Sequence, residues 1–178
     1  MSTLRLILAD QLSHGISSLN DTQPNDTVLL CETMEDATYV KHHPKKIAFL
    51  FAAMRHFAQE LQEKNMDVRY IKLTDSTNTG NLIGEVRRAV KTLKVKSIVV
   101  TEPSEYRVRK IIESCEQSLG IIVDVRPDER FLCTPEEFKV WATDKKQLRI
   151  EYFYREMRKK YKILIEPDGT SNRRTMEL

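Results

Sequence analysis

The sequence is poor in the residues from which common nucleotide-binding loops and disulfide frameworks are built. Its 178 residues include only five glycines, and no two of them have the spacing of a GxGxxG or a GxxxxGK(S/T) motif. The dinucleotide fingerprint and the phosphate-binding loop are therefore absent. The three cysteines contain no CxxC pair, which argues against a zinc ribbon and against a disulfide framework.

Long apolar runs and a strong charge imbalance are also missing. No window holds eighteen or more nearly uncharged apolar residues, as a membrane-spanning helix requires, and the N-terminus shows no signal-peptide pattern. Twenty-nine Lys and Arg against 26 Asp and Glu give a net charge of +3, which is below that of a dedicated nucleic-acid-binding protein. We therefore expect a cytoplasmic protein that makes no membrane contact.

Short apolar runs alternate with helical patterns through most of the chain. The runs, rich in β-branched residues, lie at 4–8, 27–31, 68–72, 97–101 and 121–125, and amphipathic stripes occupy 45–64, 82–93 and 108–119. Strands that alternate with helices of this length indicate βαβ units and a parallel sheet. The sequence predicts an α/β fold: a doubly wound, Rossmann-like sheet of order 3-2-1-4-5 with helices on both faces.

The C-terminal part changes to a helical pattern. Thr134 and Glu137 flank Pro135 at the spacing of a capping box, and further apolar stripes predict helices over 135–143 and 147–161. We expect an α/β domain over 1–133, a helical extension over 134–165 packed on it, and a mobile tail over 166–178.

A ligand of such a sheet binds beyond the carboxyl ends of the strands, where the strand order reverses. Asp10 and Gln11 follow the first strand, Cys31 and Glu32 end the second, and Asp36 comes shortly after. These groups suit a neutral, polar ring better than a phosphate, which the carboxylates would repel. Each of these residues also has a purely structural interpretation. Asp10 caps a helix, the acidic run Glu32, Glu35 and Asp36 is a solvated helix start, and Cys31 is a buried, inert thiol.

Other candidate functional residues give weaker signals. His42 and His43 have no third ligand at a suitable spacing, so no metal site is expected. The basic and aromatic residues of 152–161 either contact nucleic-acid phosphates or form an amphipathic helix with solvated charges. No acid–base or nucleophile pair at a plausible spacing appears, so no catalytic residue is assigned.

Several segments resemble the amino-terminal domain of the bacterial iron–sulfur cryptochrome/photolyase family, the deoxyribodipyrimidine photolyase-related proteins. The similarity is collinear from about residue 4 to about residue 165 and includes LILADQLS, EDATYVKHHPKKIAF and EYFYREMR. The resemblance implies an antenna domain that binds 6,7-dimethyl-8-ribityllumazine in an enzyme that repairs DNA photoproducts, typically of the (6-4) type. Its implied ring-contacting and wall positions are Asp10, Gln11, Cys31, Glu32, Asp36, Phe49 and Leu50.

In the family a helical domain follows, which holds FAD and a 4Fe-4S cluster and contacts damaged DNA. The three cysteines here do not match the cluster ligands, so we expect this chain alone to be inactive in repair. We also expect the surface that would face the helical domain to promote a homodimer. The alternative is a stand-alone Rossmann-like module that binds a nucleotide or a partner without photochemistry.

Overall fold

The computed structural model describes residues 2–165 and divides the chain into two compact units, Met1–Glu129 and Arg130–Leu178. The tail predicted over 166–178 lies outside the described residues. In the part that the structure describes, no helix combines the length and the apolar character that crossing a membrane would need.

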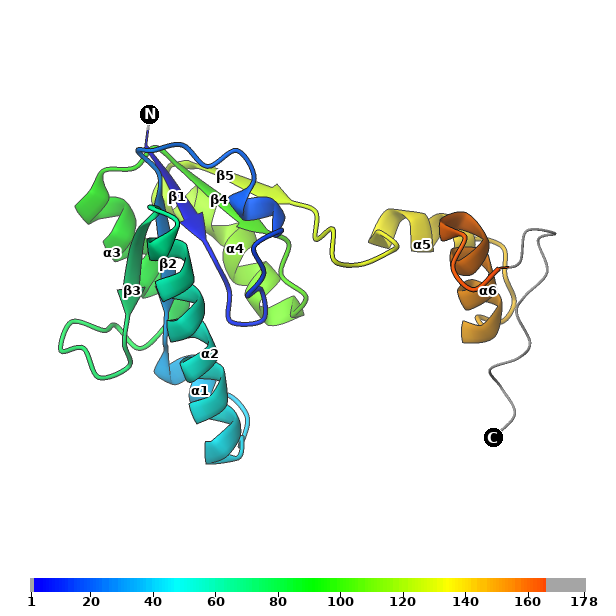
Figure 1. Cartoon of the computed structure of the whole chain (residues 1–178), viewed down its shortest axis with the longest axis horizontal. Coiled ribbons are helices and arrows are strands. Elements are labelled where there is room, and N and C mark those ends of the chain that lie inside the picture. The colour runs from blue at the N-terminus through cyan, green and yellow to red at the C-terminus, as the bar shows by residue number, and fades with distance from the viewer. Residues whose placement is uncertain (1, 166–178) are drawn as a thin grey trace. The chain divides into compact units, whose positions relative to one another are not determined.

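A five-stranded parallel sheet forms the centre of the first unit (Figure 1). Its strands are β1 (Thr3–Leu6), β2 (Thr27–Cys31), β3 (Asp67–Ile71), β4 (Ser97–Thr101) and β5 (Ile122–Arg126). They lie in the order β3-β2-β1-β4-β5, and every neighbouring pair is parallel. The predicted α/β fold and strand order are confirmed.

Three long helices connect the strands, and two short helices lie in the loops. The long ones are α2 (Pro44–Glu63), α3 (Leu82–Leu93) and α4 (Tyr106–Leu119); the short ones are η1 (Ser17–Leu19) and α1 (Met34–Thr38). The His43 side chain caps α2 by accepting from the Lys45 amide, while Pro44 occupies the first turn. Helix α4 ends at Gly120, whose φ of 66° is the left-handed conformation that favours glycine.

Each face of the sheet has its own hydrophobic core, because successive side chains of a strand point to opposite faces. On one face, buried strand residues such as Leu6 and Val100 pack against α3 and α4. On the other, Val28 and Leu30 pack against α2 and the η1 segment. The helices therefore cover both faces, as predicted, and leave the loops at the strand ends outside the two cores.

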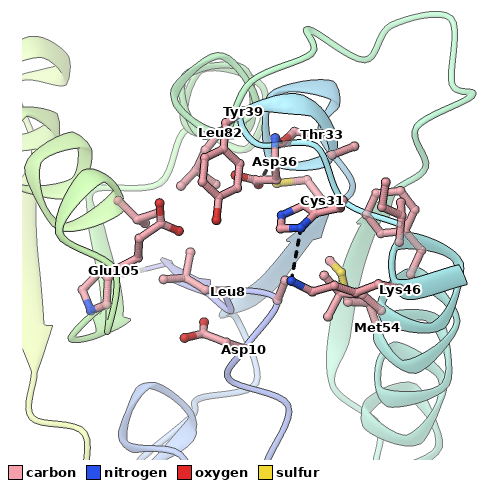
Figure 2. A pocket seen from close by; sticks show the side chains of 18 of the residues that line it. Leu8, Asp10, Cys31, Thr33, Asp36, Tyr39, Lys46, Met54, Leu82 and Glu105 are labelled. Atoms are coloured by element: carbon pink, nitrogen blue, oxygen red, sulfur yellow. Dashed lines mark hydrogen bonds between the residues drawn. The ribbon is translucent and has the colours of Figure 1, made fainter. Parts of the chain in front are cut away.

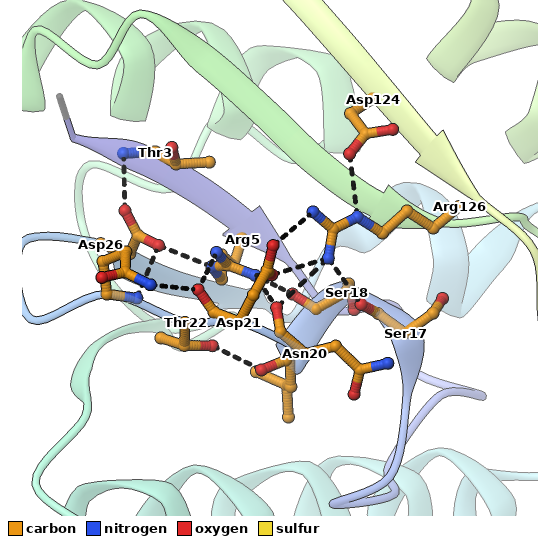
Figure 3. A network of polar contacts seen from close by, with 12 residues as sticks. Thr3, Arg5, Ser17, Ser18, Asn20, Asp21, Thr22, Asp26, Asp124 and Arg126 are labelled. Atoms are coloured by element: carbon orange, nitrogen blue, oxygen red, sulfur yellow. Dashed lines mark hydrogen bonds and ion pairs between the residues drawn. The ribbon is translucent and has the colours of Figure 1, made fainter.

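A buried arginine fixes the loop between β1 and β2 (Figure 3). Arg5, 3% exposed, donates to Asp26 at 2.8 Å and to the backbone oxygens of Ser18 and Asn20 at 2.9 and 2.6 Å. Hydrogen bonds from Arg126 and Arg5 lower the pKa of Asp21 to about 2. The buried charge of Arg5 is tolerated because the guanidinium is paired with a carboxylate and its N–H groups donate hydrogen bonds.

The second unit contains α5 (Pro135–Ala142) and α6 (Ile150–Tyr161). Thr134 and Glu137 form both halves of the predicted capping box at the start of α5. The ring of Phe153 packs edge-on against the rings of Phe138 and Trp141, at centroid distances of 5.2 and 5.0 Å. The helical extension is thus present, and its packing on the first unit stays a prediction.

Candidate functional site

A pocket with a volume of about 310 Å³ lies at the carboxyl end of the sheet, next to the loops that follow β1, β2 and β4 (Figure 2). The two loops after β1 and β4 come from neighbouring strands whose connections run in opposite directions along the sheet. This is the place where an open α/β sheet binds its ligand. The pocket lining includes Leu8, Asp10, Cys31, Thr33, Asp36, Tyr39, His42, Lys46, Leu50, Met54, Leu82, Ser104, Glu105 and Val108.

The walls of the pocket are apolar because α2 and α3 turn hydrophobic residues toward it. Leu50 and Met54, four residues apart on α2, lie on one side, and Leu82 from the start of α3 lies on another. Cys31, at the end of β2, adds its thiol. Burial raises the pKa of that thiol, and the negative charges of Glu85 and Asp36 raise it further, so the sulfur is a neutral wall group.

Polar groups are few and lie around this apolar wall. Asp10 accepts a hydrogen bond from the hydroxyl of Ser104, which joins the loops after β1 and β4. On the opposite side, the Asp36 carboxylate accepts from the Thr33 hydroxyl at 2.8 Å. Lys46 adds an ammonium group to the lining. Figure 2 shows Asp10 and Asp36 on different sides of the same hollow.

Arg107, in the first turn of α4, connects the loop after β4 to α1. Its guanidinium donates to Glu35 at 3.1 Å, to Asp36 at 2.9 Å and to Glu105 at 2.9 Å. It also lies over the Tyr39 ring, 4.4 Å from the centroid. Burial alone would lower the pKa of Arg107, but the hydrogen bonds that it donates to Asp36 and Glu105 raise this pKa, so the side chain stays charged.

The structure brings four of the seven predicted ligand-contacting residues together in the pocket lining: Asp10, Cys31, Asp36 and Leu50. The other three, Gln11, Glu32 and Phe49, do not line it. Phe49 is 76% exposed, because it lies about 100° around α2 from Leu50 and so faces away from the pocket.

Gln11 is fully buried and its amide serves the backbone. The side-chain nitrogen donates to the carbonyl oxygens of Thr101 and Glu102 at 3.1 and 3.3 Å, and the side-chain oxygen accepts from the Leu8 amide at 3.4 Å. These contacts hold the end of β1 against the end of β4. Gln11 therefore shapes the floor beneath the pocket rather than its surface.

Glu32 is also fully buried, on the side of β2 that faces away from the pocket. Its two oxygens accept from Arg55 at 2.6 and 3.0 Å, from the Tyr70 hydroxyl at 2.7 Å and from the Leu73 amide at 2.8 Å. Burial alone would raise the pKa of this carboxyl, but these hydrogen bonds outweigh it and lower the pKa. Glu32 thus joins β2, β3 and α2 as an ionised group.

Sequence reasoning missed Tyr39, Lys46 and Arg107. The signal that could have identified Arg107 is its position, because a positive charge in the first turn of a helix is disfavoured by the helix dipole. A cation there indicates that it pairs with acidic groups from elsewhere. Tyr39 and Lys46 carry no comparable signal, since exposed tyrosines and lysines are common on helices.

Metal-binding residues do not converge in the part of the chain that the structure describes. Between residues 2 and 165, no group of three or more His, Cys, Asp or Glu side chains could hold a metal ion. His43 caps α2, and the neighbouring His42 contacts the Lys46 ammonium at 3.3 Å. The two adjacent histidines therefore serve different partners.

Two comparisons with known proteins place this chain in a family. Residues 5–172 match the family model described as deoxyribodipyrimidine photo-lyase-related protein. A protein of Agrobacterium fabrum (strain C58 / ATCC 33970) named (6-4) photolyase is 50% identical over 166 residues. That match covers 93% of this chain and 33% of the relative, so the chain spans about a third of the relative's length. The chain therefore belongs to the family of deoxyribodipyrimidine photo-lyase-related proteins.

Proposed function

We propose that the first unit is the antenna-binding domain of a light-dependent DNA repair protein, and that its pocket binds a ribityllumazine-type chromophore. The single observation that supports this most strongly is the pocket at the switch point of the sheet, in a chain of the photolyase-related family. When bound, 6,7-dimethyl-8-ribityllumazine would absorb blue light and pass the excitation to a flavin. The task of this domain is then to hold a flat ring in a fixed orientation away from water.

The residues that line the pocket fit a ribityllumazine in size and chemistry. A volume of about 310 Å³ lies at the lower end of the range of small-molecule sites, as a single bicyclic ring system requires. Leu50, Met54 and Leu82 would contact the ring faces and exclude water. The carboxylates of Asp10 and Asp36 would accept hydrogen bonds from ring N–H or ribityl hydroxyl groups.

The charges of the lining favour a neutral ligand over a phosphate. Asp10, Asp36 and Glu105 all line the pocket, and only Lys46 brings a permanent positive charge to the lining. A phosphate group would be repelled by the three carboxylates. The N-terminus of α1, beside the pocket, carries Glu35 and Asp36, so it does not offer a phosphate the positive helix end that such a ligand needs.

The family resemblance assigns the flavin, the 4Fe-4S cluster and the damaged DNA to another domain, which lies outside the segment that this chain matches. We propose that the partner of this domain is the helical FAD domain, with homodimerisation of the isolated chain through the same surface. Repair activity is then expected only where a helical FAD domain accompanies this one.

Titration with 6,7-dimethyl-8-ribityllumazine tests the proposal, read by absorption and by the fluorescence of the ligand. We expect a dissociation constant of about 1 µM or tighter, together with a red-shifted absorption band of the bound ring. Leu50→Trp fills the pocket and should weaken binding by at least about 100-fold, a loss of roughly 2.7 kcal/mol. The matched control is Phe49→Trp, which adds the same ring at the neighbouring, exposed position of the same helix.

The outcomes separate the alternatives. Binding that Leu50→Trp abolishes and Phe49→Trp leaves unchanged supports the antenna proposal. Equal weakening by both variants would show that the ligand lies elsewhere on α2. A wild-type protein that shows no ribityllumazine binding while it remains folded refutes the antenna function, and the nucleotide-binding or partner-binding module would then be preferred.

A further inference from the structure

Helix α1 forms one wall of the pocket but has few contacts of its own. It contains five residues, and none of them is buried. A helix of this length is not stable by itself, because the nucleating turn fixes several residues for very few hydrogen bonds. One backbone hydrogen bond ties it to α3's preceding loop, from the Glu35 amide to the Gly80 oxygen at 2.9 Å. Side-chain contacts therefore have to hold α1 in place.

Arg107 supplies those contacts from a segment more than seventy residues away in the sequence. One guanidinium nitrogen donates to Glu35 at 3.1 Å and another to Asp36 at 2.9 Å, so both carboxylates in the first turn of α1 share one cation. The same group lies over the ring of Tyr39, the C-terminal cap of α1. Both ends of α1 are thus held by one side chain.

The guanidinium is itself held in place. Its Nε donates to Glu105 at 2.9 Å, within the loop that leads from β4 into α4. The side chain is 29% exposed, and its carboxylate partners are 34% to 39% exposed, so water screens each pair and no single pair is strong. The planar fork of arginine is what allows one side chain to orient three carboxylates and one ring at once.

We infer that Arg107 is a positioning residue of the pocket, which holds α1 so that the Asp36 carboxylate and the Tyr39 ring form its wall. Without the Arg107 guanidinium, Asp36 keeps the Thr33 hydroxyl, which donates to its carboxylate and accepts from its amide, and the Tyr39 ring loses its cation. The wall then moves more often, and a ligand between α1 and α2 dissociates faster. The ligand half of this inference rests on the proposed function, while the positioning of α1 does not.

Arg107→Met tests the inference, since it keeps the apolar stem and removes the cation. Arg109→Met is the matched control: Arg109 lies on the same helix and also pairs with two carboxylates, Glu102 at 2.8 Å and Glu113 at 3.1 Å, both of which lie outside α1. Arg107→Lys keeps the charge without the fork and should lie between Arg107→Met and the wild type. Circular dichroism establishes that each variant is folded.

Two measurements are made on the whole chain. Hydrogen exchange of the peptide that covers residues 33–43, at sub-second labelling times, should be about tenfold faster in Arg107→Met and unchanged in Arg109→Met. The dissociation constant for 6,7-dimethyl-8-ribityllumazine should rise about tenfold in Arg107→Met, mainly through faster dissociation, and stay at the wild-type value in Arg109→Met.

The exchange result and the binding result each test one part of the inference on Arg107. Unchanged exchange over residues 33–43 in Arg107→Met overturns the inference whether or not the ligand binds. Faster exchange with an unchanged dissociation constant overturns the part that concerns the pocket. If the wild type itself binds no ribityllumazine, the proposed function fails, and faster exchange confined to residues 33–43 still supports Arg107 as the residue that holds α1.

Discussion

Glu32→Gln removes one negative charge from a fully buried site while it keeps the shape of the side chain. The carboxylate accepts four hydrogen bonds, two from Arg55, one from Tyr70 and one from the Leu73 amide. A glutamine has only one side-chain oxygen, so about two of these four bonds are lost. At about 1.5 kcal/mol for each hydrogen bond to a charged group, we expect a loss of about 3 kcal/mol in the free energy of unfolding at neutral pH.

Urea unfolding followed by circular dichroism measures this loss. With a denaturant slope of about 2 kcal/mol per M, a loss of about 3 kcal/mol lowers the midpoint by about 1.5 M. Circular dichroism is preferred to fluorescence because the single tryptophan, Trp141, lies in the second unit and reports on that unit.

The effect should depend on pH in a defined direction. The folded-state pKa of Glu32 lies below the ordinary value of 4.5, because the hydrogen bonds outweigh burial. The stabilisation is therefore complete above the unfolded-state pKa and is lost as the pH falls through the folded-state pKa. The difference in stability between wild type and Glu32→Gln should be largest near about pH 7 and shrink toward about pH 3.

Glu116→Gln, an exposed position on α4, serves as the control and should change the stability by less than about 0.5 kcal/mol. A loss below about 1 kcal/mol in Glu32→Gln at neutral pH would refute the reasoning, because it would mean that the buried carboxylate contributes no more than a surface group.

Two further predictions concern the thiols and a helix glycine. Burial raises the pKa of Cys31, so this thiol should react with Ellman's reagent only after unfolding, whereas the partly exposed Cys133 should react in the native protein; rapid labelling of Cys31 in the folded chain would contradict the description of the pocket wall. Gly84→Ala places a methyl group 2.4 Å from the Thr79 hydroxyl oxygen, and it should destabilise the first unit by about 1–2 kcal/mol in the same urea assay. A neutral or stabilising effect would show that the Thr79 loop moves aside freely.

The fold could be predicted from the sequence because its signals are local and repeated. Runs of β-branched residues separated by amphipathic stripes indicate parallel strands and crossover helices, and the right-handed crossover rule limits the strand order. The predicted strands agree with the observed ones to within about two residues, the usual scatter at element ends. The start of α1 was anticipated only as an alternative, in which the acidic residues after β2 begin a helix, and Glu35 and Asp36 do lie in its first turn. Its extent was not predicted, because five residues without a buried side chain produce no apolar period.

The site was predictable only in part. The switch-point rule identifies the loops, and Asp10, Cys31 and Asp36 do line the pocket there. The rule does not say which polar residue of a loop turns inward. The Gln11 amide donates to a backbone carbonyl at the end of β4, and the Glu32 carboxylate accepts from a backbone amide after β3. Nothing in the sequence neighbours of Gln11 or Glu32 reveals those partners.

The central position of β1 has a consequence for the order in which a ribosome can complete this domain. Thr3 lies beside Ser97, 94 residues later, while Leu4 lies beside Thr27 on the other edge of the same strand. During synthesis, one edge of β1 must therefore stay without its hydrogen-bonding partner until β4, which ends at Thr101, has left the exit tunnel. A nascent chain released before that point would expose the unpaired edge of β1 to other chains, so we expect stalled translation to promote aggregation of this protein.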